Sequence, residues 1–353
     1  MMMYEVAIIG TGRIAHRHVM VINNHPDLEL VAACDIMPEK VTEFCAQYKI
    51  KSYTFLHDMI SEQRPDIIAV CTEAGNHAKN VIECSGRVEN IVCEKPMALK
   101  VEDAEEMIVE CKINKTKLFI VKQNRYNLPV LKLREALGKG RFGKLFLGTI
   151  RLRWHRDQKY FDMDAWRGTW KMDGGVAASQ ASHHVDLLQW IMGDVKWVMA
   201  HKKTFLLDIE VDDTMVAIMG FENGAVGVIE ATNAAQPDNL EGSVSILGEG
   251  GTVVIGGIAV NKMDTWKFKK YDKMDDDVME HSENPKKPDG TGDVYGFGHA
   301  RFYENVVQNI KSGKGTVVDG EEGLKSLKLI NAIYESAETG TKVYLKKESK
   351  LGK

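Results

Sequence analysis

A glycine-rich turn between an apolar run and a helix is the feature that most constrains this chain. Residues 10–15 read Gly-Thr-Gly-Arg-Ile-Ala and directly follow the apolar residues 6–9. Gly10 permits a tight turn, Gly12 lets the backbone approach a pyrophosphate, and Ala15 lets the helix pack closely on the strand. The free N–H groups that start such a helix face phosphates. The pattern predicts a dinucleotide site formed by Gly10, Thr11, Gly12, Arg13 and Ile14.

The end of the second apolar run indicates which dinucleotide is expected. Residues 28–34 are followed by Asp35, whose carboxylate can accept hydrogen bonds from the adenosine ribose and would repel the extra phosphate of NADP. Short apolar runs continue to alternate with helical stretches, which is typical of a parallel, doubly wound sheet. We therefore expect an NAD-binding Rossmann domain over residues 1–124.

The pattern changes after residue 124. Strand-like runs, several separated by Gly-rich or Asn-Gly turns, occupy residues 144–155, 195–205, 213–221, 225–232, 242–247 and 251–258. They predict a large, mostly antiparallel open sheet in a substrate-binding and oligomerisation α+β domain over residues 125–353, so that the whole chain is of the α/β class. The polar stretch 267–293 is expected to be a surface loop, whose Asp275-Asp276-Asp277 run is solvated rather than metal-binding.

Composition narrows the classes of function. The chain has 353 residues and a net charge of −4, which gives no sign of nucleic-acid binding. No apolar stretch reaches the length of a membrane span, and no signal peptide is visible. All six cysteines lie in the first third without a Cys-x-x-Cys pair, which favours buried free thiols in a reducing cytoplasm. No metal site is expected.

A second motif places a lysine near the predicted cofactor. Glu94-Lys95-Pro96 directly follows the apolar run 91–93. Ligands of an open parallel sheet bind beyond the carboxyl ends of its strands, so Lys95 is expected to face the same crevice as the glycine-rich turn. Pro96 restricts the backbone before it and helps to fix the direction of Lys95.

These motifs, with others in the same order, resemble the Gfo/Idh/MocA oxidoreductase family. The order is GTGRIA, Asp35, EKP, QNRYN, WRGTWKMDGG, SHHVD, YGFGH and VDGEEGLKSLKLINAIYES, and it covers nearly the whole chain. Residues 121–127, 166–170 and 183–190 are most similar to one branch, the UDP-N-acetyl-2-amino-2-deoxyglucuronate 3-dehydrogenases, which act on nucleotide sugars for bacterial surface polysaccharides. A homo-oligomer, dimer or tetramer, is expected.

The resemblance implies roles for individual residues. Lys95 would lie beside the nicotinamide and the reacting hydroxyl, and Glu94 at the cofactor ribose. Further cofactor contacts are implied for Thr72, His77, Gln123, Trp166 and Arg167. The turn that holds Thr72 and His77 lacks the proline that usually follows the threonine. Sugar contacts are implied, on family position, for Asn127, Tyr160, Gln180 and Tyr295.

His183 is the predicted general base. Removing a proton from a sugar hydroxyl near neutral pH needs a group that titrates there, and histidine does. Lys95 would stabilise the developing alkoxide. The family often has an aspartate four residues before this histidine, where this chain has Ser179. Asp186 can replace it only if both side chains face the same way, and His184 is the rival base.

A cationic strand suggests how an anionic substrate is held. Residues 151–155 alternate, so that Arg151, Arg153 and His155 share one face. We expect Arg153 to bind the carboxylate or diphosphate of the substrate. The alternative is that this face of the sheet is solvated or meets another subunit.

The sequence thus predicts an NAD-dependent dehydrogenase that oxidises C3 of a UDP-linked N-acetylglucosaminuronate in the synthesis of surface polysaccharide precursors. Two alternatives stay open. One is another dehydrogenase or ketoreductase of the family, acting on inositol, a free sugar or a keto-sugar. The other is an NAD-binding sensor or scaffold without catalysis, in which Lys95 and His183 would have no purpose. Recycling of the cofactor with 2-oxoglutarate is also left open.

Overall fold

The computed structural model describes residues 3–276, 278–281 and 298–345, and the chain divides into two compact units. The first unit draws on residues 1–122, 171–173 and 299–327, and the second on residues 123–170, 174–298 and 328–353. The chain therefore returns twice to the first unit, whereas the sequence pattern suggests a single boundary near residue 124. Residues 171–173 are too few to show any periodicity, so no pattern indicates their return.

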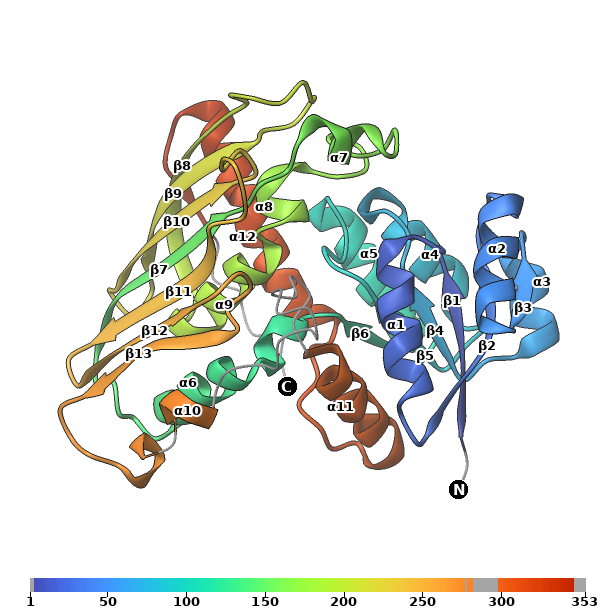
Figure 1. Ribbon diagram of the computed structural model, residues 1–353, viewed down its shortest axis with the longest axis horizontal. Coiled ribbons are helices and arrows are strands. Elements are labelled where there is room, and N and C mark those ends of the chain that lie inside the picture. The colour runs from blue at the N-terminus through green and yellow to red at the C-terminus, as the bar shows by residue number, and fades with distance from the viewer. Residues whose placement is uncertain (1–2, 277, 282–297, 346–353) are drawn as a thin grey trace. The chain divides into compact units, whose positions relative to one another are not determined.

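The first unit contains a parallel six-stranded sheet in the order β3-β2-β1-β4-β5-β6 (Figure 1). The strands are β1 (Tyr4–Ile9), β2 (Leu28–Cys34), β3 (Lys51–Tyr53), β4 (Ile67–Val70), β5 (Asn90–Cys93) and β6 (Lys117–Ile120). Strands β4 and β5 are buried throughout, as expected where helices cover both faces of a parallel sheet. Strand β3, at the edge, is short and polar, which is why no apolar run announces it.

The helices of this unit connect successive strands. They are α1 (Arg13–Asn23), α2 (Pro38–Tyr48), α3 (Leu56–Gln63), η1 (Ala74–Asn76), α4 (His77–Cys84) and α5 (Val101–Ile113). Helix α11 (Gly298–Ser312) joins them from the distant end of the chain, and its Tyr303 is fully buried. The crossovers place all carboxyl ends of the strands at one edge of the sheet.

The second unit contains an eight-stranded sheet in the order β13-β12-β11-β7-β10-β9-β8-β14. The strands are β7 (Leu145–Arg153), β8 (Val195–Lys203), β9 (Thr214–Phe221), β10 (Val226–Thr232), β11 (Glu241–Gly248), β12 (Gly251–Gly256), β13 (Lys262–Phe268) and β14 (Val343–Tyr344). All neighbours are antiparallel except β7 and β10. The expected fold class, a Rossmann sheet followed by a mostly antiparallel open sheet, is confirmed.

One face of this sheet is covered by α9 (Ser182–Met192). A Cβ added to Gly148 of β7 would lie within 3 Å of Leu188 and Met192, so the glycine allows the helix to pack closely. The remaining helices of the unit are η2 (Gln123–Tyr126), α6 (Leu128–Gly138), α7 (Gln158–Asp162), α8 (Gly175–Ser179), η3 (Lys273–Asp275), α10 (Val278–His281) and α12 (Gly320–Thr339), the last shared with the first unit. We call the sheet face that α9 covers the inner face and the opposite one the outer face.

Two expectations about side chains have different outcomes. All six cysteines are buried free thiols, as expected. Burial raises the pKa of Cys34 to about 11, which keeps it protonated. Asp275, by contrast, is not simply solvated: it forms an ion pair with Arg141 and accepts a hydrogen bond from Trp266. Within the described part of the chain, no helix is long and apolar enough to cross a membrane.

Candidate active site

The glycine-rich turn has the backbone geometry that a dinucleotide needs. Gly10 has φ +87°, and a Cβ there would lie 2.8 Å from the backbone of Cys71 and Thr72, so only glycine fits. Gly12 is the N-cap residue of α1, and a Cβ there would meet no protein atom within 4 Å. Ala15 is fully buried against the sheet. Open space in front of the helix N-terminus is what a pyrophosphate requires, so these residues fit NAD.

Asp35 lies where the sequence predicts it, directly after β2. Its Oδ2 accepts hydrogen bonds from the backbone N–H and the hydroxyl of Thr11, at 2.8 and 2.9 Å. Its Oδ1 accepts one from the backbone of Met37 at 3.0 Å. The carboxylate is therefore held beside the glycine-rich turn, in position to meet an adenosine ribose.

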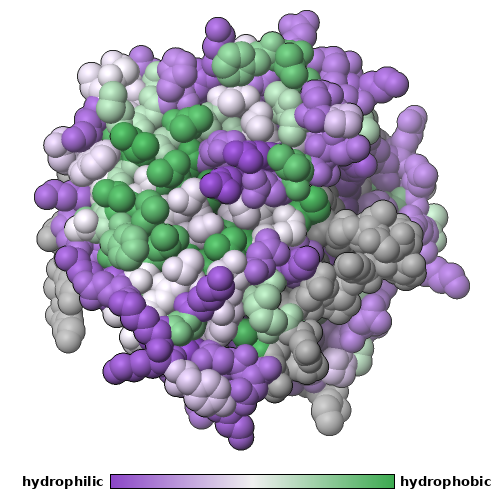
Figure 2. Space-filling view, turned by 60° about the vertical axis from the view of Figure 1, so that its left-hand side comes forward, coloured by the Kyte–Doolittle hydropathy of each residue, from purple (hydrophilic) through white to green (hydrophobic). Residues whose placement is uncertain are grey.

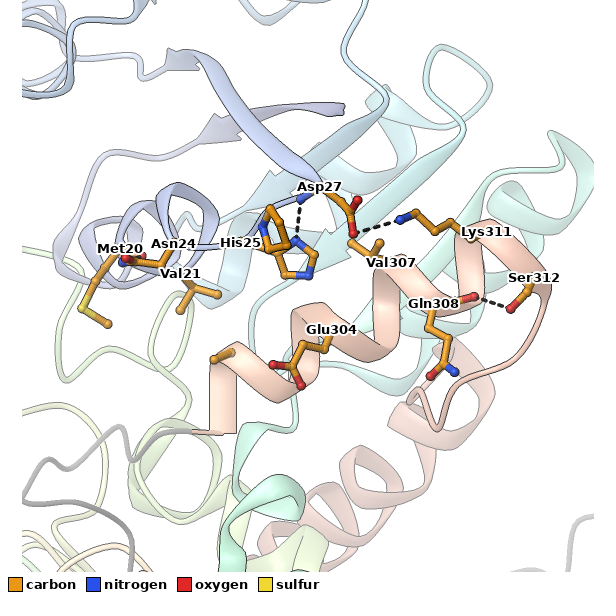
Figure 3. Close-up of a pocket in the computed structure, with 12 residues that line it drawn as sticks. Met20, Val21, Asn24, His25, Asp27, Glu304, Val307, Gln308, Lys311 and Ser312 are labelled. Carbon is orange, nitrogen blue, oxygen red and sulfur yellow. Dashed lines mark hydrogen bonds and ion pairs between the residues drawn. The ribbon is translucent and has the colours of Figure 1, made fainter. Parts of the chain in front are cut away.

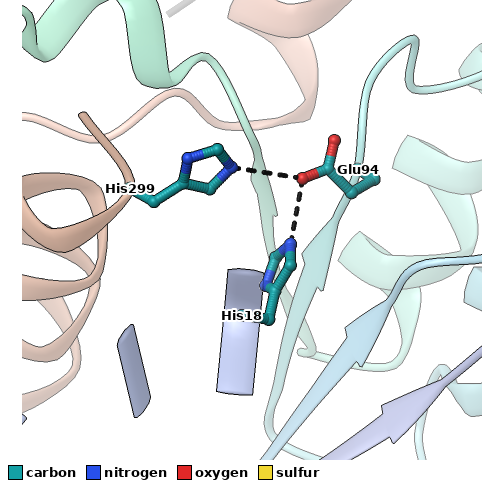
Figure 4. Close-up of side chains that lie close together, drawn as sticks. All are labelled: His18, Glu94 and His299. Carbon is teal, nitrogen blue, oxygen red and sulfur yellow. Dashed lines mark hydrogen bonds and ion pairs between the residues drawn. The ribbon is translucent and has the colours of Figure 1, made fainter. Parts of the chain in front are cut away.

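Lys95 follows β5 and is linked to a buried polar network through Glu94 (Figure 4). Oε1 of Glu94 lies 2.9 Å from Nε2 of His18 and 3.6 Å from Nε2 of His299, while Oε2 accepts the backbone N–H of Lys95 at 3.0 Å. Nδ1 of His18 lies 2.6 Å from the hydroxyl of Tyr303. Burial alone would raise the pKa of Glu94, but the contacts from His18 and His299 hold that pKa well below its usual range.

The same three side chains form the one cluster in the described residues that has metal-ligand spacing. The ligand atoms of His18, Glu94 and His299 lie within 4.8 Å of one another. The hydrogen bond from His18 to Glu94, with Tyr303 on the other ring nitrogen, accounts for this arrangement without an ion. We therefore interpret the cluster as a buried proton-sharing network that fixes Glu94.

His77, for which the resemblance implies a cofactor contact, is bound to the backbone of two neighbouring turns. Its ring is buried, with Nδ1 at 2.7 Å from the carbonyl oxygen of Pro96 and Nε2 at 2.9 Å from that of Thr72. Burial lowers its pKa, and the hydrogen bonds to the two carbonyl oxygens oppose that shift. His77 therefore ties the turn after β4 to the turn that contains Lys95. Thr72 is engaged as well, because its hydroxyl accepts a hydrogen bond from Asn80.

His183 and His184 lie side by side in the first turn of α9 and are both buried. His184 packs against β11, where a Cβ on Gly242 would lie 3.0 Å from its Nε2, and its ring meets Trp154 edge-on at 6.1 Å. These contacts give His184 a packing role. They favour His183 as the base by elimination, although its role remains a prediction.

Asp186 is not placed to serve as the missing carboxylate partner of His183. Its two oxygens accept hydrogen bonds from Nε and Nη2 of Arg125, at 2.7 and 2.8 Å, and both side chains are buried. The guanidinium of Arg125 also lies 4.7 Å from the ring of Trp190. The hydroxyl of Ser179, at the position of the family aspartate, donates to the carbonyl oxygen of Gly175. Both residues thus hold local structure.

Arg153 does not share a site with His183, which corrects the predicted substrate contact. It lies on the outer face of the sheet, since Leu152 beside it is fully buried on the α9 side. It donates to Glu230 at 2.8 Å and to Glu241, its direct cross-strand partner, at 2.9 Å. The sequence period shows that Arg151 and Arg153 share a face, but not that two glutamates from β10 and β11 meet that face.

Two other predicted contacts fall inside the second unit. Asn127 is fully buried, and its amide donates to the carbonyl oxygens of Ala259 and Val260, so it braces a turn. Gln123 is buried in η2. Tyr295, also predicted to contact the sugar, lies outside the described residues.

The remaining predicted residues gather around the aromatic ring of Tyr160. Arg167 lies 4.6 Å from that ring and 4.6 Å from the ring of Trp166. The amide of Gln180 donates to the Tyr160 hydroxyl at 3.3 Å. An additional residue, Arg156, lies 5.3 Å from the same ring and was not predicted. Its position directly after the strand, two residues beyond Trp154, is the only signal the sequence offers.

The first unit also carries a surface pocket. It is formed by the end of α1 and one side of α11, with the ion pair of Asp27 and Lys311 at its rim (Figure 3). None of the predicted cofactor or substrate residues lines it. The pocket therefore does not contribute to the candidate site.

The fold and the glycine-rich turn define a nicotinamide-dinucleotide-dependent oxidoreductase with a Rossmann unit and a second unit built on an open sheet. Comparison with family models agrees: residues 4–122 match the NAD-binding Rossmann fold of the Gfo/Idh/MocA oxidoreductases, and residues 134–345 match the C-terminal alpha/beta domain of the same family. The chain belongs to the Gfo/Idh/MocA oxidoreductase family. It is an NAD-dependent dehydrogenase of the sugar type.

Solved structures and curated relatives differ in what they bind. The WlbA dehydrogenase from Bordetella pertussis, in complex with NADH and UDP-GlcNAcA, is 39% identical, with a TM-score of 0.92 over 98% of this chain and 99% of that one. WlbA from Chromobacterium violaceum, with the same two ligands, is 38% identical, with a TM-score of 0.90 over 98% and 96%. A myo-inositol 2-dehydrogenase from Thermotoga maritima is 25% identical over 97% of this chain and 98% of its own length.

Proposed function

We propose that this enzyme oxidises the C3 hydroxyl of UDP-GlcNAcA, a UDP-linked N-acetylglucosaminuronate, with NAD as the oxidant, in the synthesis of a surface polysaccharide precursor. The observation that supports this most is the identity of 38–39%, over nearly the whole chain, to two dehydrogenases crystallised with NADH and UDP-GlcNAcA. The curated inositol and glucoside dehydrogenases are only 24–25% identical. A substrate of the kind that these relatives are named for, a free polyol or a simple glycoside, is the alternative for this enzyme.

In the proposed mechanism, each catalytic residue has one task. His183 removes the proton of the C3 hydroxyl, and the ammonium group of Lys95 stabilises the developing alkoxide. Bound NAD would supply the hydride-accepting chemistry at C3. Gly10, Gly12 and the first turn of α1 would hold its pyrophosphate, and Asp35 its adenosine ribose. Glu94 supports the segment that holds Lys95, since it accepts the lysine backbone N–H.

A substrate panel tests this proposal directly. Purified enzyme supplied with NAD and UDP-GlcNAcA should produce NADH. The nucleotide sugar should become two mass units lighter. UDP-GlcNAc, myo-inositol and a simple glucoside should react far more slowly, as measured by absorbance and mass spectrometry. A higher kcat/KM for inositol or the glucoside than for UDP-GlcNAcA would show that the enzyme is a polyol or glycoside dehydrogenase instead. Adding 2-oxoglutarate would reveal any recycling of the cofactor.

We also propose that the outer face of the eight-stranded sheet joins copies of this chain. Met199, Val216, Ile218 and Val226 from three neighbouring strands are each 43–49% exposed there. Figure 2, turned so that the side with this sheet comes forward, shows hydrophobic side chains gathered within a hydrophilic border. The molar mass measured by light scattering should be that of a dimer or tetramer. The Ile218→Lys variant should have a lower molar mass in solution. A wild-type monomer would refute the proposed interface.

A cytoplasmic location also stays a prediction.

A further inference from the structure

Backbone hydrogen bonds hold the residue that follows β10 beside the end of β7. The N–H of Asn233 donates to the carbonyl oxygen of Asp213 at 2.8 Å, and the carbonyl oxygen of Asn233 accepts the N–H of Arg156 at 2.8 Å. The N–H of Trp154, in turn, donates to the carbonyl oxygen of Thr232 at 2.9 Å. Asn233 is therefore fixed at its backbone on both sides, and the direction of its side chain is fixed as well.

The side chain of Asn233 faces the inner side of the eight-stranded sheet. Along β10, Ile229 and Ala231 are buried, whereas Glu230 between them is half-buried. Successive side chains of a strand point to opposite faces. Asn233 is buried and continues this alternation two residues after Ala231. Because Glu230 lies on the outer face with Arg153, Asn233 points to the inner face, which carries α9.

This position lies next to the helix that carries the proposed base. Trp154, the neighbour of Asn233 at the end of β7, meets the ring of His184 edge-on at 6.1 Å. His184 is adjacent to His183 in the first turn of α9. His183 is itself only 7% exposed, and Asn233 is 2% exposed. A substrate that reaches the base therefore has to contact side chains that are nearly as buried as Asn233.

Oδ1 of Asn233 is buried and accepts no hydrogen bond from any residue that the structure describes. Asn223, at the other end of β10, differs: its amide donates to the carbonyl oxygen of Met192 at 2.9 Å, and its Oδ1 accepts the backbone N–H of Ala225 at 3.0 Å. Most buried polar atoms have a partner, because one without a partner destabilises the fold. A hydrogen bond from a bound ligand would offset that cost at Asn233.

We propose that Asn233 binds the sugar of the substrate, where its Oδ1 accepts a hydrogen bond from an N–H or O–H group next to the reacting carbon. In UDP-GlcNAcA, the neighbours of C3 are C2, which bears the acetamido N–H, and C4, which bears a hydroxyl. Both groups are neutral donors, so a neutral buried acceptor suits them without the cost of burying a charge. This inference rests on the proposed function and adds a sugar contact that the family resemblance does not identify.

The test compares Asn233→Leu, which replaces the amide by an apolar group of similar size, with the matched control Asn223→Leu. Dissociation constants for UDP-GlcNAcA and its C4 epimer, UDP-GalNAcA, are measured by calorimetry in the presence of NADH. Asn233→Leu should weaken UDP-GlcNAcA binding by roughly five- to a hundredfold, because a buried donor of the sugar loses its acceptor. Its midpoint of denaturant unfolding should not fall, since Oδ1 has no partner among the described residues. Asn223→Leu should lower the midpoint and leave both dissociation constants unchanged.

The two nucleotide sugars identify the donor. Weakening of UDP-GlcNAcA alone in Asn233→Leu identifies the C4 hydroxyl, whose direction differs in the epimer. Equal weakening of both identifies the acetamido N–H, which they share.

Three results would overturn the inference. If the wild type binds UDP-GlcNAcA and the folded Asn233→Leu variant binds it equally well, Asn233 is not a sugar contact and the proposed function stands. Asn233→Ala decides in the same way if Asn233→Leu does not fold. A lower unfolding midpoint with unchanged dissociation constants in both variants would show that Asn233 is structural. If the folded wild type binds neither nucleotide sugar, the proposed function and this inference both fail.

Discussion

The surroundings of Lys95 and of His183 differ in what their charged neighbours do. Beside Lys95, the buried Glu94 is held by His18 and accepts the lysine backbone N–H, so the network supports the segment that contains Lys95. Beside His183, the carboxylate of Asp186 is bound by Arg125 and supports α9 instead. A charged residue near a catalytic one in sequence is therefore a functional partner only where the side-chain geometry brings them together.

The largest effects are expected from Lys95 and His183, the two residues proposed to be catalytic. Lys95→Met removes the charge but keeps the length of the side chain, and His183→Ala removes the base. Each should lower kcat by a factor of about a hundred to ten thousand, with NADH affinity largely retained. Steady-state kinetics and NADH fluorescence titration measure both. His184→Ala is the control and should reduce kcat much less per folded molecule; if it is the more severe variant, the base is assigned wrongly.

A variant of the Arg125–Asp186 pair tests whether Asp186 of α9 has only a structural role. Asp186→Asn leaves a buried arginine without its charge partner and should cost about 3 to 5 kcal/mol of unfolding free energy. Denaturant unfolding measures this loss. Ser179→Ala, which removes one neutral hydrogen bond, should cost only about 1 kcal/mol. A shifted pH profile of kcat/KM with unchanged stability in Asp186→Asn would instead show that Asp186 orients His183.

Asp212 gives the second unit a dependence of stability on pH. Burial raises its pKa from 3.8 to about 6 in the folded protein. Between these values the native state binds more protons than the unfolded chain, so the contribution of Asp212 is fully present below pH 4 and is lost as pH rises through 6. Relative to the Asp212→Asn variant, the free energy of unfolding of the wild type should fall by up to about 3 kcal/mol between pH 4 and 7. A constant difference in unfolding free energy across that range would contradict this.

The smallest effect is expected at the adenosine end of the cofactor site. Asp35→Ala should narrow the preference for NAD over NADP by about tenfold, or about 1.4 kcal/mol, because the carboxylate no longer repels the extra phosphate. Competitive binding titrations with both cofactors measure the ratio. Since Asp35 also accepts from Thr11, Thr11→Val controls for loosening of the turn. Tighter binding of NADP than of NAD by the wild type would refute the preference.

Local patterns were sufficient for most strands of both sheets. The glycine-rich turn, Asp35 and the motif at Lys95 each follow a strand of a parallel sheet, and such a sheet places the carboxyl ends of its strands at one edge. Gly340, which follows the last residue of α12 at φ +66°, has the left-handed conformation that favours glycine at the end of a helix. The short strands β3 and β14 and the polar β13 escaped prediction because they lack a distinct apolar run.

The sequence by itself determined the family, the fold class and the cofactor, since these depend on backbone turns and on periodicities that neighbouring residues encode. Only the tertiary structure decided which polar side chains are already occupied. Arg153 meets two glutamates from other strands, Asn127 braces a distant turn and His77 joins two loops. Each of these partners is at least five residues away along the chain, and most are far more distant. No local spacing encodes such contacts, because packing alone brings the partner atoms within hydrogen-bond distance.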